Sequence, residues 1–507
     1  MRSRRNFLKL GGITAVAASA TACRVIGQEV AQQQLPETIL LPNDPPATIL
    51  AGQPPDPALR ILNRAGFGPR PGDVQQVRKM GLEAYVEEQL QPETIDDTAA
   101  DLILRSLDFQ QMDISQLLAK DKDDLVLELV GGTLLRAVYS KRQLYEAMVE
   151  FWSDHFNIFL RKNEFMPALK FVDDRDVIRP HALGKFRDLL FASAFSPAML
   201  VYLDNIRNTN ETSNENYGRE LLELHTLGVH AGYTQKDVQE AARVLTGLGV
   251  RRRGPRQGQT FFDKNAHDQG EKFILGKRFP ASQGEDDIHQ LLEMLLVAPQ
   301  TAVFIATKLV RRFVADEPPE ALVQQVAQTY QETDGDIKAM LRVIFLSEEF
   351  SAAPSKLKRP FTYMVSVLRA THTNLRLGRG REIGRWLRML GQVPFHWPPP
   401  DGFPDTTNAW AANLLPRWNF ALTLVNNQVQ GASAPLERLV QAGQADSDPD
   451  AVLEFFSRLL NGRSLTPAEQ QQFQQYIGSG SLNDGNTIQN LKDSVALMLA
   501  SPAFQWT

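Results

Sequence analysis

Apolar residues recur at helical spacing over most of the chain from Leu59 onward, and this periodicity is the strongest constraint on the fold. Few stretches alternate with period two for long enough to make strands, and Pro and Gly stand mainly at segment edges. We therefore predict a mostly α fold, built as one large multi-helical assembly. The clearest helical segments are residues 144–159, 186–195, 217–227, 236–248, 287–296, 301–314 and 337–345.

Two segments depart from this pattern. Gly and Arg dominate residues 249–279, where apolar runs are brief, so we expect a short irregular or β-like insertion there. Residues 394–405 contain Pro398, Pro399 and Pro400. Consecutive prolines lack backbone donors and hold φ extended, so this segment is predicted to be an ordered, Pro-rich loop.

Composition places the chain in the ordinary globular class. It has 507 residues, of which 43% are hydrophobic and 22% are charged, and a single cysteine, so disordered and disulfide-stapled classes are excluded. The formal net charge is −5 at pH 7. The one dense basic run, residues 251–256, is interpreted as a solvated loop, and no nucleic-acid partner is expected.

Residues 1–22 are interpreted as a targeting signal. Arg4 and Arg5 precede Phe7 and a small, apolar stretch over residues 10–22, a pattern typical of twin-arginine export. An ordinary secretory signal with two adjacent arginines is the alternative. Either interpretation places the mature chain in the periplasm, on the outer face of a membrane or outside the cell.

Cys23 is the only cysteine and follows the small residues 20–22. Lipidation would protect a lone thiol in an oxidising compartment, so the position favours a lipid anchor, although processing to a soluble form also fits the residues before it. Residues 23–56 are rich in Gln and Pro and are predicted to be a tether. A main helical domain over 57–420 and a C-terminal helical segment over 421–507, packing on it or extending it, complete the predicted organisation.

The strongest polar cluster lies in residues 214–228. Glu220 and Glu223 are three residues apart on an expected α-helix, so they share a face. Such a pair can hold a divalent metal, or can separate its pKa values so that one carboxyl donates a proton and the other accepts one. Arg219 stands four residues from both Glu215 and Glu223, however, which is also the spacing of a structural ion-pair string.

Histidines supply the other candidate catalytic residues. On an α-helical wheel His225 falls about 200° from Glu223, and His155 lies among aromatic residues, where a packing role is the alternative. His267 and Asp268 form a polar pair in a Gly-bounded loop, a setting that often carries function. The hypothesised catalytic set is therefore Glu220, Glu223, His225, His267, Asp268 and His155, with Glu220 and Glu223 as the metal ligands if a divalent metal binds.

Several recognised chemistries are not indicated. The chain has no Gly-x-Ser-x-Gly elbow, no phosphate-binding Gly-rich loop, no Gly-x-Gly-x-x-Gly motif and no His-Glu-x-x-His motif. A single cysteine also excludes Cys-ligated iron–sulfur clusters. Nucleotide-dependent chemistry is therefore not expected, and no cofactor other than a divalent metal is suggested.

The motifs also carry a family resemblance. Over residues 59–420 the sequence resembles the bacterial exported family catalogued as domain of unknown function 1800 (DUF1800). The resembling segments are residues 62–69, 151–156, 214–228, 233–238, 242–247, 267–268 and 398–402. The resemblance implies a large, mostly helical, twin-arginine exported protein, often encoded beside an exported partner that resembles sulfatases or alkaline phosphatases. The family has no agreed activity and no accepted catalytic residues.

Two functions are carried forward. The first is an exported, lipid-tethered helical protein with an accessory or binding role in envelope or extracellular-polymer processes. The alternative is a metal-assisted or carboxylate-based hydrolase with its site on the 214–228 helix. Convergence of Glu220, His225 and His267 on one pocket would favour the enzyme, whereas a closed Arg219 network around Glu220 would favour the binding role.

Overall fold

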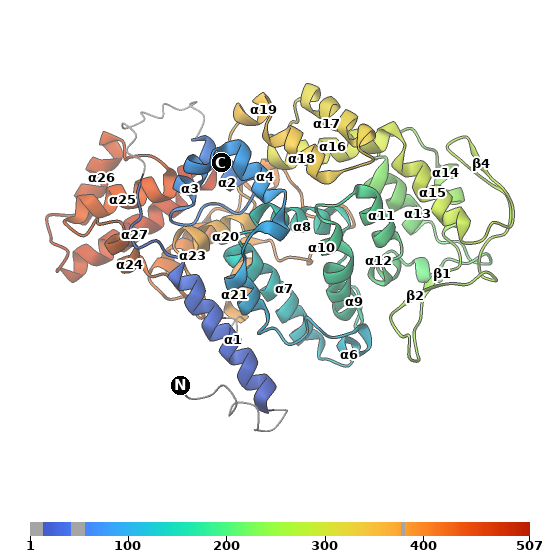
Figure 1. Ribbon diagram of the computed structural model, residues 1–507, viewed down its shortest axis with the longest axis horizontal. Coiled ribbons are helices and arrows are strands. Elements are labelled where there is room, and N and C mark those ends of the chain that lie inside the picture. The colour runs from blue at the N-terminus through green and yellow to red at the C-terminus, as the bar shows by residue number, and fades with distance from the viewer. Residues whose placement is uncertain (1–13, 42–55, 377–380) are drawn as a thin grey trace.

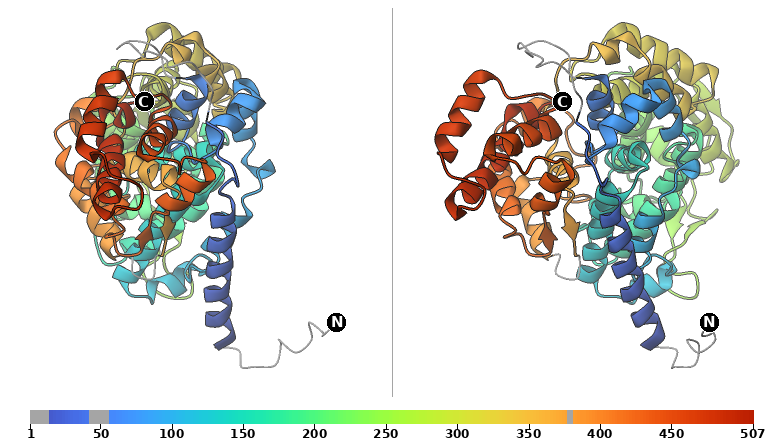
Figure 2. Two further views of the ribbon diagram at one scale, coloured as in Figure 1. Left: turned by 90° about the vertical axis from the view of Figure 1, so that its left-hand side faces the viewer. Right: turned by 60° about the vertical axis from the view of Figure 1, so that its left-hand side comes forward.

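The computed structural model describes residues 14–41, 56–376 and 381–507, and most of them are helical, which confirms the predicted fold class. The start of the predicted leader and residues 42–55 of the predicted tether lie outside this range. The molecule is elongated, with helices α24–α27 at one end and the β hairpins at the other (Figure 1). Figure 2 shows the C-terminal helices, in red, gathered in a lobe beside the rest of the chain.

The helices of the first half are mostly short and succeed one another closely. They are α1 (Thr14–Gln33), α2 (Pro57–Arg64), α3 (Asp73–Met80), α4 (Leu82–Gln89), η2 (Pro92–Thr94), α5 (Thr98–Leu104), α6 (Ile114–Leu118), α7 (Lys122–Tyr139), α8 (Gln143–His155), α9 (Met166–Asp173), η3 (Asp174–Ile178), α10 (Arg179–His181), α11 (Phe186–Ala194), α12 (Pro197–Tyr202), η4 (Asn205–Arg207), α13 (Asn216–Glu220) and η5 (Leu221–Thr226).

The second half continues in the same way. Its helices are α14 (Gln235–Val244), α15 (Asp286–Leu296), α16 (Pro299–Phe313), α17 (Glu320–Glu332), α18 (Ile337–Phe345), α19 (Glu348–Ser351), α20 (Pro360–Ala370), α21 (Arg381–Leu390), α22 (Thr407–Trp410), α23 (Leu415–Val425), α24 (Leu436–Ala442), α25 (Pro449–Asn461), α26 (Pro467–Ile477), α27 (Gly485–Ala500) and α28 (Pro502–Gln505).

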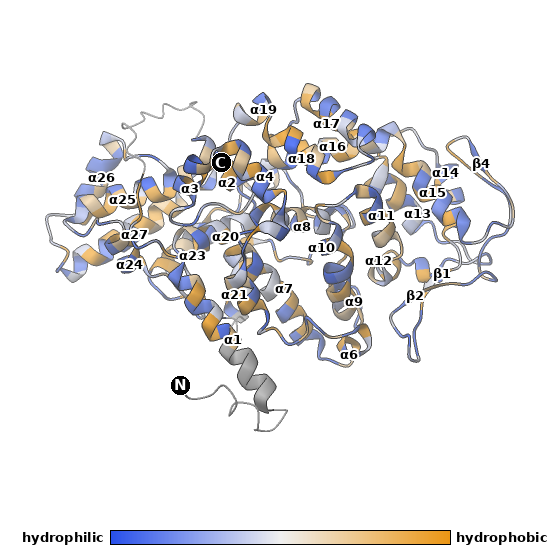
Figure 3. Cartoon of the chain, in the orientation of Figure 1, coloured by the Kyte–Doolittle hydropathy of each residue, from blue (hydrophilic) through white to orange (hydrophobic). Residues whose placement is uncertain are grey.

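Two large clusters of buried apolar side chains hold these helices together. Most helices carry hydrophobic and hydrophilic residues on different faces, as Figure 3 shows, and the apolar faces meet inside. One cluster joins α8, α11 and α12 to α15–α18, with Trp152 and Leu309 among its members. The other joins α7 and α20 to α23, α25 and α27, through residues such as Tyr363 and Leu499. The C-terminal segment therefore extends the second core.

The described part of the predicted tether is folded onto the body, which corrects the expectation for residues 23–41. Helix α1 continues to Gln33 and packs against α5, and Ile39 is buried. The contact runs through small residues: a Cβ on Gly27 would lie 2.7 Å from the Ile103 backbone nitrogen, and Ala31, one turn later, is buried. Because Gly and Ala make this interface, it leaves no apolar periodicity in the sequence.

The predicted β-like insertion forms two antiparallel hairpins. Strand β1 (Leu248–Val250) pairs with β2 (Thr260–Phe262), and β3 (Lys272–Ile274) pairs with β4 (Lys277–Phe279). Leu275 and Gly276 join β3 to β4 with positive φ at both residues, as a tight hairpin turn requires. A further two-residue pair, β5 (Asn374–Leu375) with β6 (Ala432–Ser433), was not expected.

The Pro-rich segment is an ordered loop, as predicted. Its carbonyl groups accept hydrogen bonds from side chains: Asn157 Nδ2 donates to the Trp397 and Pro399 oxygens (2.9 and 2.7 Å), and the Tyr202 hydroxyl donates to Pro398 (2.6 Å). Gly402 then turns the chain against the end of α8. It has φ +76°, and a Cβ there would lie 2.1 Å from the Asp154 carbonyl oxygen.

This close approach predicts that Gly402→Ala destabilises the protein strongly. The new methyl group meets both a left-handed φ and the Asp154 backbone, so we expect a loss of more than about 3 kcal/mol in the free energy of unfolding. Gly254→Ala is the matched control, since Gly254 also has positive φ but faces open space, and should lose only about 1 kcal/mol. Urea unfolding measures both, and equal losses would contradict the prediction.

A cluster of buried ion pairs joins α8, α16 and the start of α20 to the Pro-rich loop. Arg359 pairs with Asp154 (2.5 Å) and reaches Glu150 (3.5 Å), which also pairs with Arg312 (2.5 Å). Lys356 extends the cluster to two further carboxylates, which belong to Asp405 (3.3 Å) and Asp316 (3.2 Å). We call these seven residues the central ion cluster.

The last residues of the sequence pack beside this cluster. Residues 505–507 run antiparallel to residues 356–358, with Lys356 N donating to the Thr507 oxygen (2.8 Å) and Lys358 N to the Gln505 oxygen (2.9 Å). The Arg64 guanidinium of α2 binds the Thr507 oxygen (2.7 Å) and the Val314 oxygen (3.1 Å). One side chain thus ties together segments from the start, the middle and the end of the described chain.

Stability should depend on pH through Asp405. Burial opposes its ionisation, but Lys356, Arg312 and Arg359 outweigh this effect and lower the pKa of Asp405 to about 2. A lowered carboxyl pKa stabilises the fold above the unfolded-state value of about 3.9, and this contribution is lost as pH falls towards 2. We expect Asp405→Asn to lose about 2 kcal/mol at pH 7 and progressively less below pH 4.

Urea unfolding at pH 7 and pH 3 measures this effect. Asp176→Asn is the control, because Asp176 is half exposed and pairs with Arg175 at the surface, where ion pairs contribute about 1 kcal/mol or less. A loss for Asp405→Asn that is the same at both pH values would show that the carboxylate charge is not the cause.

No single described helix is long and apolar enough to cross a membrane. Helices α15 and α16 are long and apolar enough only when they are taken together, and the chain bends by 63° between them.

Candidate functional site

Glu220 and His225 lie on one continuous helix that changes its winding between them. Residues Asn216–Glu220 are α-helical, whereas Leu221–Thr226 form a π-helical turn in which the Thr226 hydroxyl donates to the Leu221 oxygen (2.6 Å). A π turn inserts one extra residue and rotates the side chains of the next turn about the helix axis. His225 is consequently buried, whereas Leu224 is only half-buried.

His225 and His155 form a buried pair. The two ring centroids are 6.2 Å apart, and His155 Nε2 donates to the His225 carbonyl oxygen (3.1 Å). Burial lowers the pKa of His225 to about 3 and that of His155 well below its ordinary value, so both rings are neutral near pH 7. Rings that contact one or both histidines belong to Phe151, Trp152, Phe156, Phe186, Tyr217 and Phe304.

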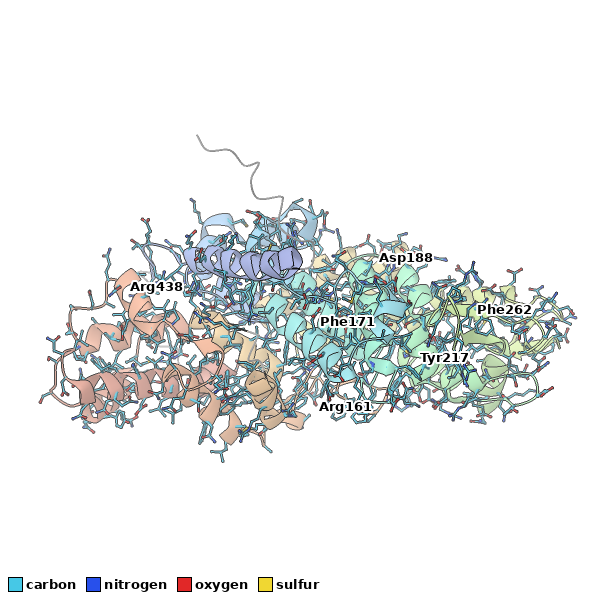
Figure 4. The ribbon with its side chains drawn as sticks, turned by 90° about the horizontal axis from the view of Figure 1, so that it is seen from below. Arg161, Phe171, Asp188, Tyr217, Phe262 and Arg438 are labelled. Atoms are coloured by element: carbon cyan, nitrogen blue, oxygen red, sulfur yellow. The ribbon has the colours of Figure 1, made fainter. Side chains whose placement is uncertain are left out.

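Three ring nitrogens of this pair have no hydrogen-bond partner among the described residues. They are His155 Nδ1 and both nitrogens of His225. Unpaired buried polar atoms are uncommon in folded proteins, and they mark places where water, an ion or a functional constraint acts. Figure 4 labels Tyr217, whose ring packs against His225, in the half of the molecule that also holds Phe262, away from Arg438.

Glu220 is the acidic residue of this region, and it lies nearer to solvent than the histidine pair. Its carboxyl group is about half-buried and has no hydrogen-bond or ion-pair partner among the described residues. Burial, followed by the charge of Glu223, raises the pKa of Glu220 to about 7, and Asp401 adds to the increase. A carboxyl group with a pKa near neutrality can both donate and accept a proton at physiological pH.

Arg219 binds the other two acids of the helix. Its guanidinium pairs with Glu215 (3.2 Å) and Glu223 (3.6 Å), as the i,i+4 spacing predicted. The arginine network therefore engages Glu223 and leaves Glu220 outside it. In the described part of the chain no group of three or more His, Cys, Asp or Glu side chains is arranged to hold a metal ion, and a metal at Glu220 and Glu223 stays a prediction.

His267 and Asp268 contact a separate set of residues. His267 Nδ1 lies 2.9 Å from the Thr246 oxygen and its Nε2 lies 3.2 Å from Asp287 Oδ2. Arg243 binds both oxygens of Asp268 (2.8 and 3.0 Å) and lowers the pKa of this carboxyl. Both residues take part in an ion-paired network that fastens the hairpins to α14, and their contacts do not include Glu220 or the histidine pair.

Two residues that the sequence analysis did not select act on the candidate site, Asp401 on Glu220 and Lys308 on the histidine pair. Asp401 is exposed on the Pro-rich loop and accepts a hydrogen bond from Trp397 Nε1 (2.9 Å). Lys308 of α16 lies 5.5 Å from the Phe304 ring centroid, and burial lowers its pKa to about 8. The charge of Lys308 also lowers the pKa of both histidines. Asp401 could have been selected from the sequence, because it comes directly after the proline run. Lys308 could not, because it resembles an ordinary helix-surface lysine.

A family described as "Protein of unknown function (DUF1800)" matches residues 60–506. The chain belongs to the DUF1800 family. Neither a curated protein nor a solved structure matches it. The DUF1800 match continues beyond residue 420, where the resemblance seen in the sequence ended, so the C-terminal helices are part of the matched region.

Three of the DUF1800-like segments meet at the candidate site. The end of α8 supplies His155, η5 supplies His225, and the Pro-rich loop folds onto Asp154 through Gly402. Residues 242–247 and 267–268 meet separately, around Arg243. Within this DUF1800 protein the resembling segments thus form two clusters, and the first contains Glu220, a half-buried carboxyl group with a raised pKa.

The raised pKa of Glu220 predicts a pH-dependent stability difference. A carboxyl whose pKa rises on folding stabilises the fold below its unfolded value, and this contribution disappears as pH rises through about 7. We therefore expect Glu220→Gln to match the wild type at about pH 4, below the unfolded-state pKa of about 4.3, and to have a higher melting temperature at pH 8. Glu215→Gln, which loses its Arg219 partner, should show no such gain. A Glu220→Gln variant that gains nothing at pH 8 would contradict the raised pKa.

Proposed function

We propose that this protein is a carboxylate-based hydrolase of envelope or extracellular polymers, with Glu220 as its proton donor. The observation that supports this proposal is the state of Glu220: a half-buried carboxyl without a partner among the described residues, with a pKa raised to about 7. By contrast, Asp268 and Asp405 are ion-paired and have a lowered pKa. Acids that transfer protons at neutral pH typically have a raised pKa and no ion-pair partner.

The chemistry requires two acids with different roles. Protonated Glu220 donates its proton to the leaving oxygen of the scissile bond while a water molecule attacks the other side of that bond. Asp401, on the exposed loop, accepts the proton that the water releases. Each end of the broken bond then carries a hydroxyl group. Proton exchange with solvent returns Glu220 to its protonated form and Asp401 to its ionised form. A glycosidic bond suits this division between a proton-donating and a proton-accepting carboxyl.

Export is part of the proposal. The pair Arg4 and Arg5 supports a twin-arginine route, and the small residues before Cys23 support a lipid anchor on an outer membrane face. Envelope and extracellular polymers are available as substrates there, whether the protein lies in the periplasm or outside the cell. The exported sulfatase-like or phosphatase-like partner implied by the family resemblance would act on the same material.

The test is hydrolysis of defined envelope polymers by the purified full-length chain. Peptidoglycan, a neutral polysaccharide and an acidic polysaccharide are incubated with the protein, and new reducing ends are counted. We expect Glu220→Gln to lower kcat by about 100-fold or more, because a general acid contributes at least that much. Glu215→Gln is the matched control, because Glu215 also pairs with Arg219, and it should stay within a few-fold of the wild type.

The pH profile distinguishes proton donation from a structural role. Wild-type kcat/KM should decline as pH rises above about 7, where Glu220 loses its proton. Turnover by Glu220→Gln at the wild-type rate, or a profile that is flat across neutrality, would overturn the assignment.

A binding role is the second candidate, and an exposed apolar face supports it. Leu415, Trp418 and Leu422 of α23 are exposed at positions i, i+3 and i+7, which is one face of a helix. Exposed apolar patches of this kind often mark interaction surfaces. Polymer binding without turnover in the same assay, weakened by Trp418→Ser and unchanged by Glu220→Gln, would favour this accessory role over the hydrolase.

A further inference from the structure

A second pocket lies away from the Glu220 region, among α5, α7, α8 and α10. Its volume is about 480 Å³, which is in the range of small-molecule sites. Leu104 and Leu107 supply an apolar part of the wall, and Tyr145 lies beside them. The charged side chains that line the pocket are Asp97, Asp101, Arg105, Arg136, Arg142, Glu146 and Arg179.

Three of the four arginines in this pocket form no ion pair within the described residues. Arg136 Nη2 donates to Gln110 Oε1 (2.9 Å), and Arg142 Nη2 donates to the Ile95 oxygen (3.2 Å). The Arg142 Nε atom is buried and has no acceptor there. Arg105 is exposed at the rim, next to the end of α5. Several N–H groups of guanidinium forks therefore remain available to a ligand.

The acidic residues of the pocket are largely occupied by other partners. Glu146 accepts from Arg179 (3.1 Å), whose guanidinium also binds Asp174 (2.9 Å). Asp97 accepts from the Ser140 hydroxyl (2.6 Å) and from the Lys141 backbone nitrogen (2.8 Å). Asp101 is exposed on α5, one turn before Arg105. Positive charge thus prevails where Arg136 and Arg142 face the pocket.

Partial burial of Arg136 adds to the case for an anion. Desolvation is the main cause that lowers the pKa of Arg136 to about 10, the neighbouring charge of Arg179 adds to it, and Glu146 and Asp174 oppose it. A guanidinium that is removed from water needs an anion or several acceptors to recover its hydration free energy. Carboxylate, phosphate and sulfate groups match the planar fork of arginine and form two parallel hydrogen bonds with it.

We propose that this pocket binds the oxyanion group of a small acidic ligand, held by Arg136 and Arg142 and screened at the rim by Arg105. The pocket is larger than an inorganic anion, so the ligand has an organic part that contacts Tyr145, Leu104 and Leu107. An acidic monosaccharide has this combination of features. Binding at this pocket does not depend on Glu220 or on any hydrolytic activity.

Calorimetric titration of the full-length chain tests the proposal with three probes. These are glucuronate, inorganic phosphate and, as a neutral control, glucose. We expect glucuronate to bind and glucose not to bind, with about tenfold weaker glucuronate binding in Arg136→Gln and in Arg142→Gln. If phosphate saturates the site and glucuronate binds no more tightly than phosphate, the site is assigned to a free inorganic anion. This result would overturn the acidic-sugar form of the proposal.

Three variants keep the test decisive. Arg105→Gln changes only an exposed side chain, so it should fold normally and still weaken glucuronate binding a few-fold. Arg136→Lys retains the charge and should bind more tightly than Arg136→Gln. Arg278→Gln, on an exposed residue of β4, is the control for loss of one positive charge elsewhere. Absence of anion binding to the wild type, or equal binding in Arg105→Gln, Arg142→Gln and Arg278→Gln, would overturn the proposal.

Discussion

The central ion cluster is the interaction on which the rest of the structure depends. Arg359 at the start of α20 pairs with Asp154 at the end of α8, and Lys356 pairs with Asp405 of the Pro-rich loop. Helices α8 and α20 belong to different apolar clusters, so these pairs fix the two cores relative to each other. Apolar contacts alone tolerate sliding, whereas buried charges must meet their partners or suffer a large desolvation penalty. The position of the loop, and with it the Asp401 side of the candidate site, is set by this requirement.

Much of the fold could be predicted from the sequence because its signals are local. Helical periodicity, the Gly-rich insertion and the proline run are each visible in neighbouring residues of the sequence. The structures that these three patterns predicted were all confirmed. The packing of α1 could not be foreseen, since the small residues Gly27 and Ala31 allow the close approach of α1 to Ile103 of α5. Long-range packing through small side chains has no periodic signature, and the same residues are equally common in linkers.

The candidate site was predictable only in part. The spacing of Arg219 correctly indicated its pairs with Glu215 and Glu223, because i,i+4 geometry is fixed by the helix. The burial of His225 was not predictable, since a π turn changes the phase of the helix after Leu221. Asp401 and Lys308 reach the site through tertiary folding alone. Sequence reasoning therefore found Glu220 and its neighbours Glu223 and Arg219, but not Asp401 or Lys308, which act from other parts of the fold.

The antiparallel pairing of residues 505–507 with residues 356–358 has a consequence for biosynthesis. The contact between Arg64 and Thr507 joins positions 443 residues apart, so it forms only after Thr507 has left the ribosome. Until then the Arg64 guanidinium lacks the Thr507 oxygen, and the backbone nitrogens of Lys356 and Lys358 lack their acceptors in residues 505–507. This contact is therefore made after the segments that it joins, and a chain cut before residue 505 is expected to leave these groups without their acceptors.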